Sequence, residues 1–110
     1  MPPKSIPSSR VSPDIEKAAP APPSWTFLTN HTHVLVCLSR DSAMTVRKLA
    51  VQVGITERSV QRILGDLETA GAVTRLKEGR CNRYFVNGSF QLRHPLESQH
   101  TVQDLLQAIR

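Results

Sequence analysis

Two short amphipathic segments, joined by only three residues, constrain this chain more than any other feature. In each segment four apolar residues recur at the i, i+3, i+4, i+7 spacing of one helix face. They are Val46, Leu49, Ala50 and Val53 in the first segment, and Val60, Ile63, Leu64 and Leu67 in the second. Thr45 and Thr56 can cap the two helices, and Gly54 favours the positive φ of a sharp helix exit. The connection 54–56 is too tight for anything but two helices packed at an angle.

One further helix is expected on each side of this pair. Asn30 can cap a helix over residues 31–39, and Thr101 can cap another at the C-terminal end. Their apolar faces are formed by Val34, Leu35 and Leu38 in the first, and by Val102, Leu105, Leu106 and Ile109 in the last. Gly65 lies in the middle of the helix that follows Thr56, where glycine costs about 1 kcal/mol of stability relative to alanine, and Gly71 ends that helix.

After Gly71 the pattern changes from helical to strand periodicity. Residues 73–76 and 82–86 are rich in β-formers, and the polar segment 77–80 between them contains a glycine, as expected of a two-stranded hairpin. The predicted fold is α+β but mainly α. It is a three-helix winged helix-turn-helix with a two-stranded β wing and an additional C-terminal helix.

The prolines divide the chain. Seven of the eight lie between Pro2 and Pro23, among Ser and Ala, where few apolar side chains offset the entropy of ordering. We expect residues 1–23 to form a disordered Pro-rich tail, partly polyproline II, with docking of that tail to a partner as the alternative. The winged domain is predicted over residues 24–93, followed by a linker and a final helix over 94–110.

The charge is concentrated on the predicted domain. The chain has 14 Lys and Arg against 9 Asp and Glu, a net charge of +5, and the segment 40–93 holds the whole surplus. Such an excess on a small domain favours a polyanionic partner. The longest apolar run, residues 34–38, is too short to span a membrane. Two cysteines make no disulfide framework and the N-terminus has no signal-peptide core, so we expect a cytoplasmic protein.

The segments VRKLAVQVGITERSVQRIL (46–64), LETAGAV (67–73) and GRCNRY (79–84) carry a resemblance to a known class. They resemble the winged helix-turn-helix DNA-binding domains of bacterial transcriptional regulators, in particular the MarR-like and IclR-like groups. The resemblance covers roughly residues 30–86. It implies a sequence-specific regulator that binds double-stranded DNA in the cytoplasm, associated with the nucleoid. The third helix, about 57–70, would enter the major groove, and the wing, about 73–86, would contact the backbone or the minor groove.

The candidate contact residues follow from the rotation of about 100° per residue along a helix. If the apolar side of the third helix faces the core, the residues that face out or flank that face are Arg58, Ser59, Gln61, Arg62 and Gly65. The predicted base contacts are Arg58 and Gln61, with Thr56 and Ser59 as short-range partners and with Arg62 on either a base or a phosphate. Arg and Gln suit bidentate bonds to guanine and adenine, although a merely solvated helix face is the plainer alternative. Candidate backbone and wing contacts are Arg47, Lys48, Arg75, Lys77, Arg80, Asn82 and Arg83.

The resemblance also implies a homodimer, because MarR-like proteins dimerise through terminal helices. The predicted interface is the apolar side of the last helix, Val102, Leu105, Leu106 and Ile109, which alternatively packs on the first helix of its own chain. Phe85 occupies a position of the wing where the resemblance implies a polar or basic residue. Its side chain suits either a dimer contact or packing under the wing.

No enzyme motif is found: neither a phosphate-binding glycine loop nor Gly-x-Ser-x-Gly, nor paired acids in an apolar setting. We expect no cofactor, no bound metal and no small-molecule ligand. His33 and Cys37, one helical turn apart, with His94 and His100, leave a metal sensor as a weaker alternative, and Cys81 beside two arginines leaves a redox response. The main rival function is a winged-helix protein-interaction module that does not bind DNA, and structured RNA is a further candidate partner.

Overall fold

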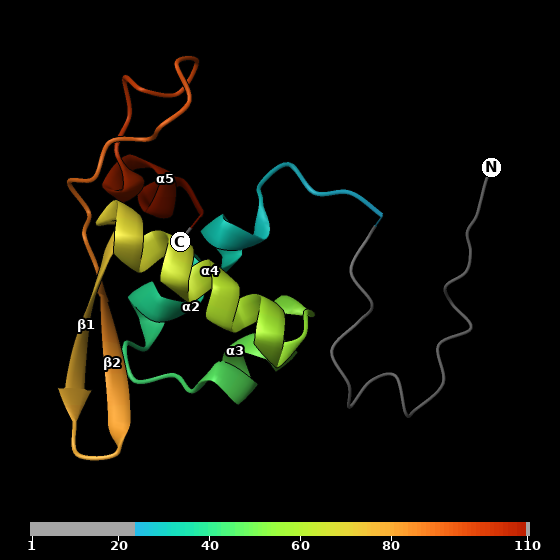
Figure 1. Ribbon diagram of the computed structural model, residues 1–110. Coiled ribbons are helices and arrows are strands. Elements are labelled where there is room, and N and C mark those ends of the chain that lie inside the picture. Colours follow the sequence, from blue (N-terminus) through green and yellow to red (C-terminus); the bar gives the residue numbers. More distant parts are fainter. Residues whose placement is uncertain (1–23, 110) are drawn as a thin grey trace.

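The computed structural model describes residues 24–109, so the predicted tail at 1–23 and the last residue lie outside the described part. Within it, the elements run in the order α2 (Asn30–Arg40), α3 (Val46–Val53), α4 (Glu57–Ala70), β1 (Val73–Glu78), β2 (Cys81–Val86) and α5 (Val102–Ile109) (Figure 1). This is the predicted winged helix-turn-helix with a hairpin after the third helix and an additional C-terminal helix. None of the helices described is long and apolar enough to cross a membrane.

The helix pair α3 and α4 is capped as its sequence predicts. The Thr45 side chain accepts a hydrogen bond from the Lys48 backbone N–H at 3.1 Å. The Thr56 side chain accepts one from the Ser59 backbone N–H at 3.0 Å. Gly54 ends α3 at φ 86°, in the left-handed region that glycine adopts without steric cost. These local bonds set the sharp change of direction between the two helices.

The predicted cap of the first helix is wrong. Thr29, and not Asn30, occupies the N-cap position of α2, and its side chain makes no capping hydrogen bond. Asn30 is already helical, and its Oδ1 lies 3.1 Å from Nδ1 of His33, one turn along. Asn30 is therefore engaged by a side chain rather than by the free backbone N–H groups of the first turn.

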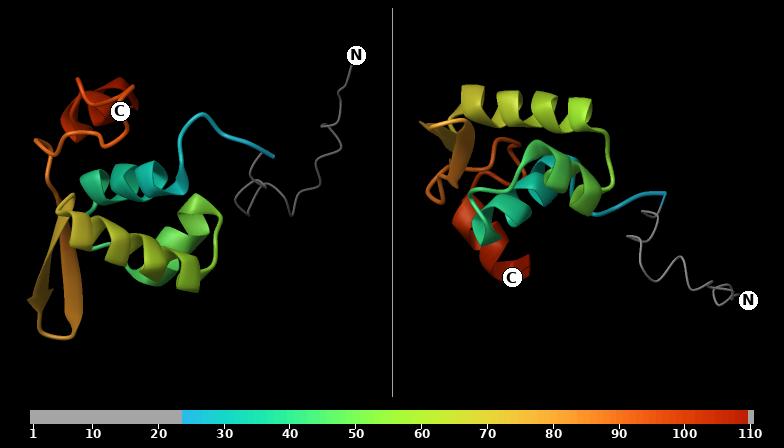
Figure 2. Two further views of the ribbon diagram at one scale, coloured as in Figure 1. Left: turned by 45° about the horizontal axis from the view of Figure 1, so that its top comes forward. Right: turned by 90° about the horizontal axis from the view of Figure 1, so that it is seen from below.

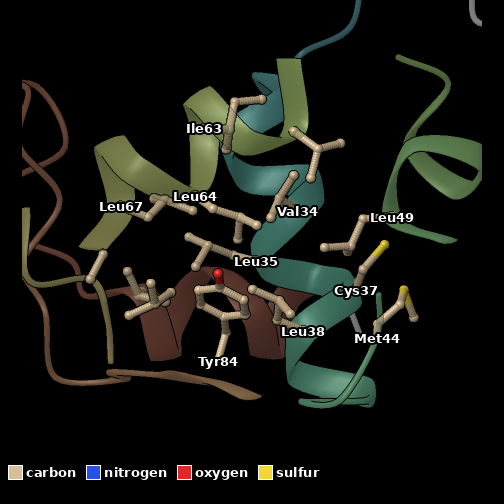
Figure 3. Close-up of a cluster of buried hydrophobic side chains, with 14 of the residues drawn as sticks. Val34, Leu35, Cys37, Leu38, Met44, Leu49, Ile63, Leu64, Leu67 and Tyr84 are labelled. Carbon is tan, nitrogen blue, oxygen red and sulfur yellow. The ribbon is translucent and has the colours of Figure 1, made fainter. Parts of the chain in front are cut away.

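The core is built around α2, which packs against α3, α4, α5 and β2. All four apolar residues predicted on the inner face of α4 are buried, and Val34, Leu49 and Val60 are fully enclosed. Figure 3 shows α4 and α2 meeting through Ile63, Leu64 and Leu67 on one side and Val34, Leu35 and Leu38 on the other, with Tyr84 of β2 closing the cluster. Because the apolar face of α4 is buried against α2, the opposite face of α4 is exposed to solvent.

The wing is longer than predicted. The strands pair antiparallel from Val73 opposite Val86 to Glu78 opposite Cys81, leaving only Gly79 and Arg80 in the turn. Gly79 has φ 61°, which a two-residue hairpin turn requires and which a four-residue polar connection does not predict. The Tyr84 backbone N–H also donates to Ser42 O at 3.0 Å, which ties the base of β2 to the segment between α2 and α3.

The last helix, α5, lies against α2 and against no other helix or strand of the described residues. Thr101 caps it as predicted: its hydroxyl accepts from the Asp104 N–H at 3.3 Å, and its own N–H donates to Asp104 Oδ2 at 3.1 Å. The right-hand view of Figure 2 shows α4 on one side of the molecule and α5 on the other, with α2 between them. Helices α4 and α5 therefore do not contact each other directly.

Candidate nucleic-acid interface

The outward face of α4 carries three long polar side chains in water. Arg58, Gln61 and Arg62 are all exposed, on the side of the helix opposite its buried residues. None of the ion pairs between described residues uses either arginine. Figure 2 shows α4 along the edge of the domain, with no other described element in front of it. The two predicted base contacts, Arg58 and Gln61, therefore lie together with Arg62, whose predicted contact is a base or a phosphate, and all three are accessible.

Thr56 and Ser59 have a different role at the start of the helix. The Thr56 hydroxyl donates to Ser59 Oγ at 2.9 Å while it accepts from the Ser59 backbone N–H. Ser59 is half-buried, and its own hydroxyl proton is free for another acceptor. These two residues fix the first turn of α4, which determines the direction in which Arg58 projects.

The two acids that flank the outward face are drawn toward other elements. Asp66 Oδ2 lies 2.9 Å from Nε2 of His31 on α2, and Glu68 Oε2 lies 3.3 Å from Nε of Arg75 on β1. All four side chains are about half exposed, so each contact contributes at most about 1 kcal/mol to stability. Asp66, one turn after Arg62, is thus directed toward α2, and Glu68 is directed toward β1.

The register of the hairpin separates the predicted wing residues. Cross-strand partners share a face, so Arg75, Lys77 and Asn82 lie on the same face as the buried Tyr84. Arg83 lies on the opposite face, where its Nε is 3.4 Å from Glu78 Oε1. The candidate wing contacts therefore lie on two opposite faces of the hairpin, with Arg80 in the turn between the strands.

The turn and the second helix supply the remaining basic residues. Arg80 lies in the exposed turn of the hairpin, and Arg47 and Lys48 are exposed in the first turn of α3, where no acid is present. A positive charge at a helix N-terminus opposes the helix dipole. Stability alone does not account for two cations at that position.

Phe85 lies on the same face of the wing as Leu76 and Arg83. The Phe85 side chain is 42% exposed and that of Leu76 is 48% exposed. Phe85 is therefore only partly covered by its own chain, and it borders a hollow between the end of α2 and α5.

Gly65, which is expected to face out or flank the buried face, and Thr69 also lie on the outward face of α4. Gly65 and Thr69 are exposed and follow Arg58 and Arg62 at a spacing of seven residues, about two turns. Thr69 is absent from the predicted contacts, although the same rotation of 100° per residue would have placed it. A groove of about 1210 Å³ runs beside this part of α4, and the segment 90–97 forms part of its opposite wall.

The cysteine and histidine side chains are not clustered. No group of three or more potential metal ligands comes together among residues 24–109. Cys37 is buried, its Sγ lies 3.7 Å from Gln52 Oε1, and burial raises the pKa of its thiol above the ordinary value, an effect that Arg40 partly offsets. Cys81 is exposed on the wing.

Two angled helices, a buried core behind the second and a paired hairpin after it define a winged helix-turn-helix domain. Residues 29–80 match the model of the MarR family. This part of the chain is a winged helix-turn-helix domain that is similar to the MarR family, as the resemblance of residues 46–84 predicts.

One solved structure that resembles this chain is the zinc-dependent MarR family transcriptional regulator AdcR in its Zn(II)-bound state. The two chains are 19% identical, with a TM-score of 0.44, and the match covers 66% of this chain and 55% of the other. This chain thus corresponds to little more than half the length of that regulator. No curated protein sequence matches the chain.

Proposed function

We propose that this protein is a transcriptional regulator that binds specific sequences of double-stranded DNA. The observation that carries the proposal is the outward face of α4, where Arg58, Gln61 and Arg62 are exposed and neither arginine pairs with an acid of the described residues. An α-helix fits the major groove, and Arg and Gln suit bidentate contacts to guanine and adenine. The similarity of residues 29–80 to the MarR family supports the same partner.

The basic residues around α4 provide the contacts to the sugar-phosphate backbone in this proposal. Of the predicted backbone and wing contacts, the basic residues that enter no ion pair among the described residues are Arg47 and Lys48 on α3 and Lys77 and Arg80 on the wing, and the exposed Asn82 adds a neutral amide donor. Arg75 and Arg83 each hold a carboxylate of their own chain, so each contributes less than a free cation unless it changes partner. Such contacts orient the protein but carry no sequence information.

The protein acts as a homodimer in this proposal. Val102 and Leu106 of the predicted interface are 2% and 5% exposed because they pack within their own chain. Leu105 and Ile109 are half-buried on α5, and the neighbouring Leu96 is 89% exposed, so these three leave apolar surface for a second copy. Since α5 lies across the domain from α4, pairing there leaves both copies of α4 free (Figure 2). A DNA target places such a dimer in the cytoplasm, at the nucleoid.

Selection of bound oligonucleotides from a random duplex pool tests the proposal. We expect enrichment of two half-sites whose centres are about one helical turn of DNA apart, because a symmetric dimer reads a symmetric site. Titration of the enriched duplex at several salt concentrations should give a slope of log K against log salt near −7, for about eight phosphate contacts.

The same titration separates the proposal from its rival. If the protein binds no duplex even at low salt, the proposal fails and a protein-interaction domain is favoured. If single-stranded or structured RNA competes better than the enriched duplex, the partner is RNA.

A further inference from the structure

Gly65 is a glycine that its own fold does not require. It lies in the middle of α4, and it is not among the described glycines with positive φ. A Cβ atom added at Gly65 would meet no atom within 4 Å, so no neighbouring group of the described residues needs the space. Glycine nevertheless weakens a helix relative to alanine, because it loses more backbone entropy on folding.

The position of Gly65 suggests what the missing side chain makes room for. It lies one turn after Arg62 and one turn before Thr69, on the exposed side of the helix. The acids on either side of this line, Asp66 and Glu68, are held by His31 and Arg75. The backbone of α4 is therefore bare at the centre of a surface whose nearest negative charges are already engaged.

We infer that duplex DNA comes into direct van der Waals contact with the α4 backbone at Gly65, and that the absence of a side chain permits this approach. The inference rests on the proposed function and adds the docking geometry. From Arg58 to Thr69 the line of outward residues is roughly 16 Å long at 1.5 Å per residue. The helix lies along the groove over this length, instead of entering it only by its first turn.

In this arrangement Gly65 is a positioning residue for the contacts around it. A side chain at position 65 would hold the helix away from the bases and lengthen the hydrogen bonds of Arg58, Gln61 and Arg62 together. Hydrogen bonds weaken steeply as their geometry departs from the optimum, so a small displacement affects the whole surface.

Two substitutions of graded size test the inference on the full chain, with the duplex enriched by the wild-type protein as the probe. Gly65→Ala should raise the melting temperature, because alanine favours the helix, and should weaken binding about tenfold. Gly65→Gln should weaken binding further. Since neither change alters charge, the salt dependence should remain that of the wild type.

Ser39→Gln is the matched control. Ser39 is exposed in the last turn of α2 and borders a hollow to which α4 contributes no residue. The control should melt and bind like the wild type. The inference is overturned if Gly65→Ala binds as tightly as the wild type or more tightly, or if Ser39→Gln weakens binding equally. A wild-type protein that enriches no duplex would instead overturn the proposed function, and this inference with it.

Discussion

Replacement of Arg58 with alanine should separate DNA recognition from folding. Arg58 is exposed in the first turn of α4 and enters no ion pair among the described residues. Its positive charge opposes the helix dipole at that end. Loss of the side chain should therefore leave the free energy of unfolding within about 0.5 kcal/mol of wild type, or raise it slightly.

The expected loss in binding is larger and depends on sequence. A bidentate contact from arginine to guanine contributes about 1–3 kcal/mol of discrimination, which corresponds to about 5–150-fold in the dissociation constant. A phosphate contact instead weakens binding to all sequences and lowers the salt slope by about 1. The ratio of affinities for the enriched duplex and for random DNA therefore distinguishes the two kinds of contact.

Fluorescence anisotropy with both duplexes, together with thermal melting, measures these quantities. Arg40→Ala is the charge-matched control, because Arg40 is exposed at the end of α2 and borders the hollow shared with α5 rather than α4. An equal loss for Arg58→Ala on both duplexes would make Arg58 a phosphate contact. Unchanged affinity would remove it from the interface and contradict the assignment of α4 as the reading helix.

Four further outcomes follow from burial. Substitution of both Leu105 and Ile109 with glutamine should convert a dimer to a monomer without unfolding it, and an unchanged mass by light scattering would refute α5 as the interface. At neutral pH a thiol reagent should modify Cys81 rapidly and Cys37 only on unfolding, since Cys37 is buried with a raised pKa; equal rates would contradict this. That raised pKa also means that the contribution of Cys37 to stability is complete below the ordinary thiol pKa and is lost as the pH rises through the raised value. Leu49→Ala should cost about 2–5 kcal/mol by denaturant titration, because the side chain is fully enclosed, and a cost below 1 kcal/mol would mean that the core collapses around the gap.

Features that depend on short stretches of chain were predictable. The caps at Thr45 and Thr56 are hydrogen bonds between residues three apart, so the sequence contains both partners. The exposed side of α4 follows from the spacing of its apolar residues alone. The prediction that Arg58 and Gln61 face water needed no knowledge of what packs behind them.

Features that depend on distant partners were not predictable in the same way. The sequence does not show that Arg75 pairs with Glu68, because the two side chains meet only in the folded structure. The two-residue turn at Gly79 extends both strands beyond the ends that their residue propensities predict. The N-terminal cap of α2 was mispredicted for a local reason, because the Asn30 side chain lies against His33, one turn along the same helix.

The sequence by itself determined the order of the helices and strands, and which face of each helix is apolar, because helix geometry converts spacing directly into direction. Only the tertiary structure decided which charges are free, since pairing depends on elements that meet across the core. It also decided that α4 and α5 lie on opposite sides of α2, because the apolar faces of both helices pack against this one central helix.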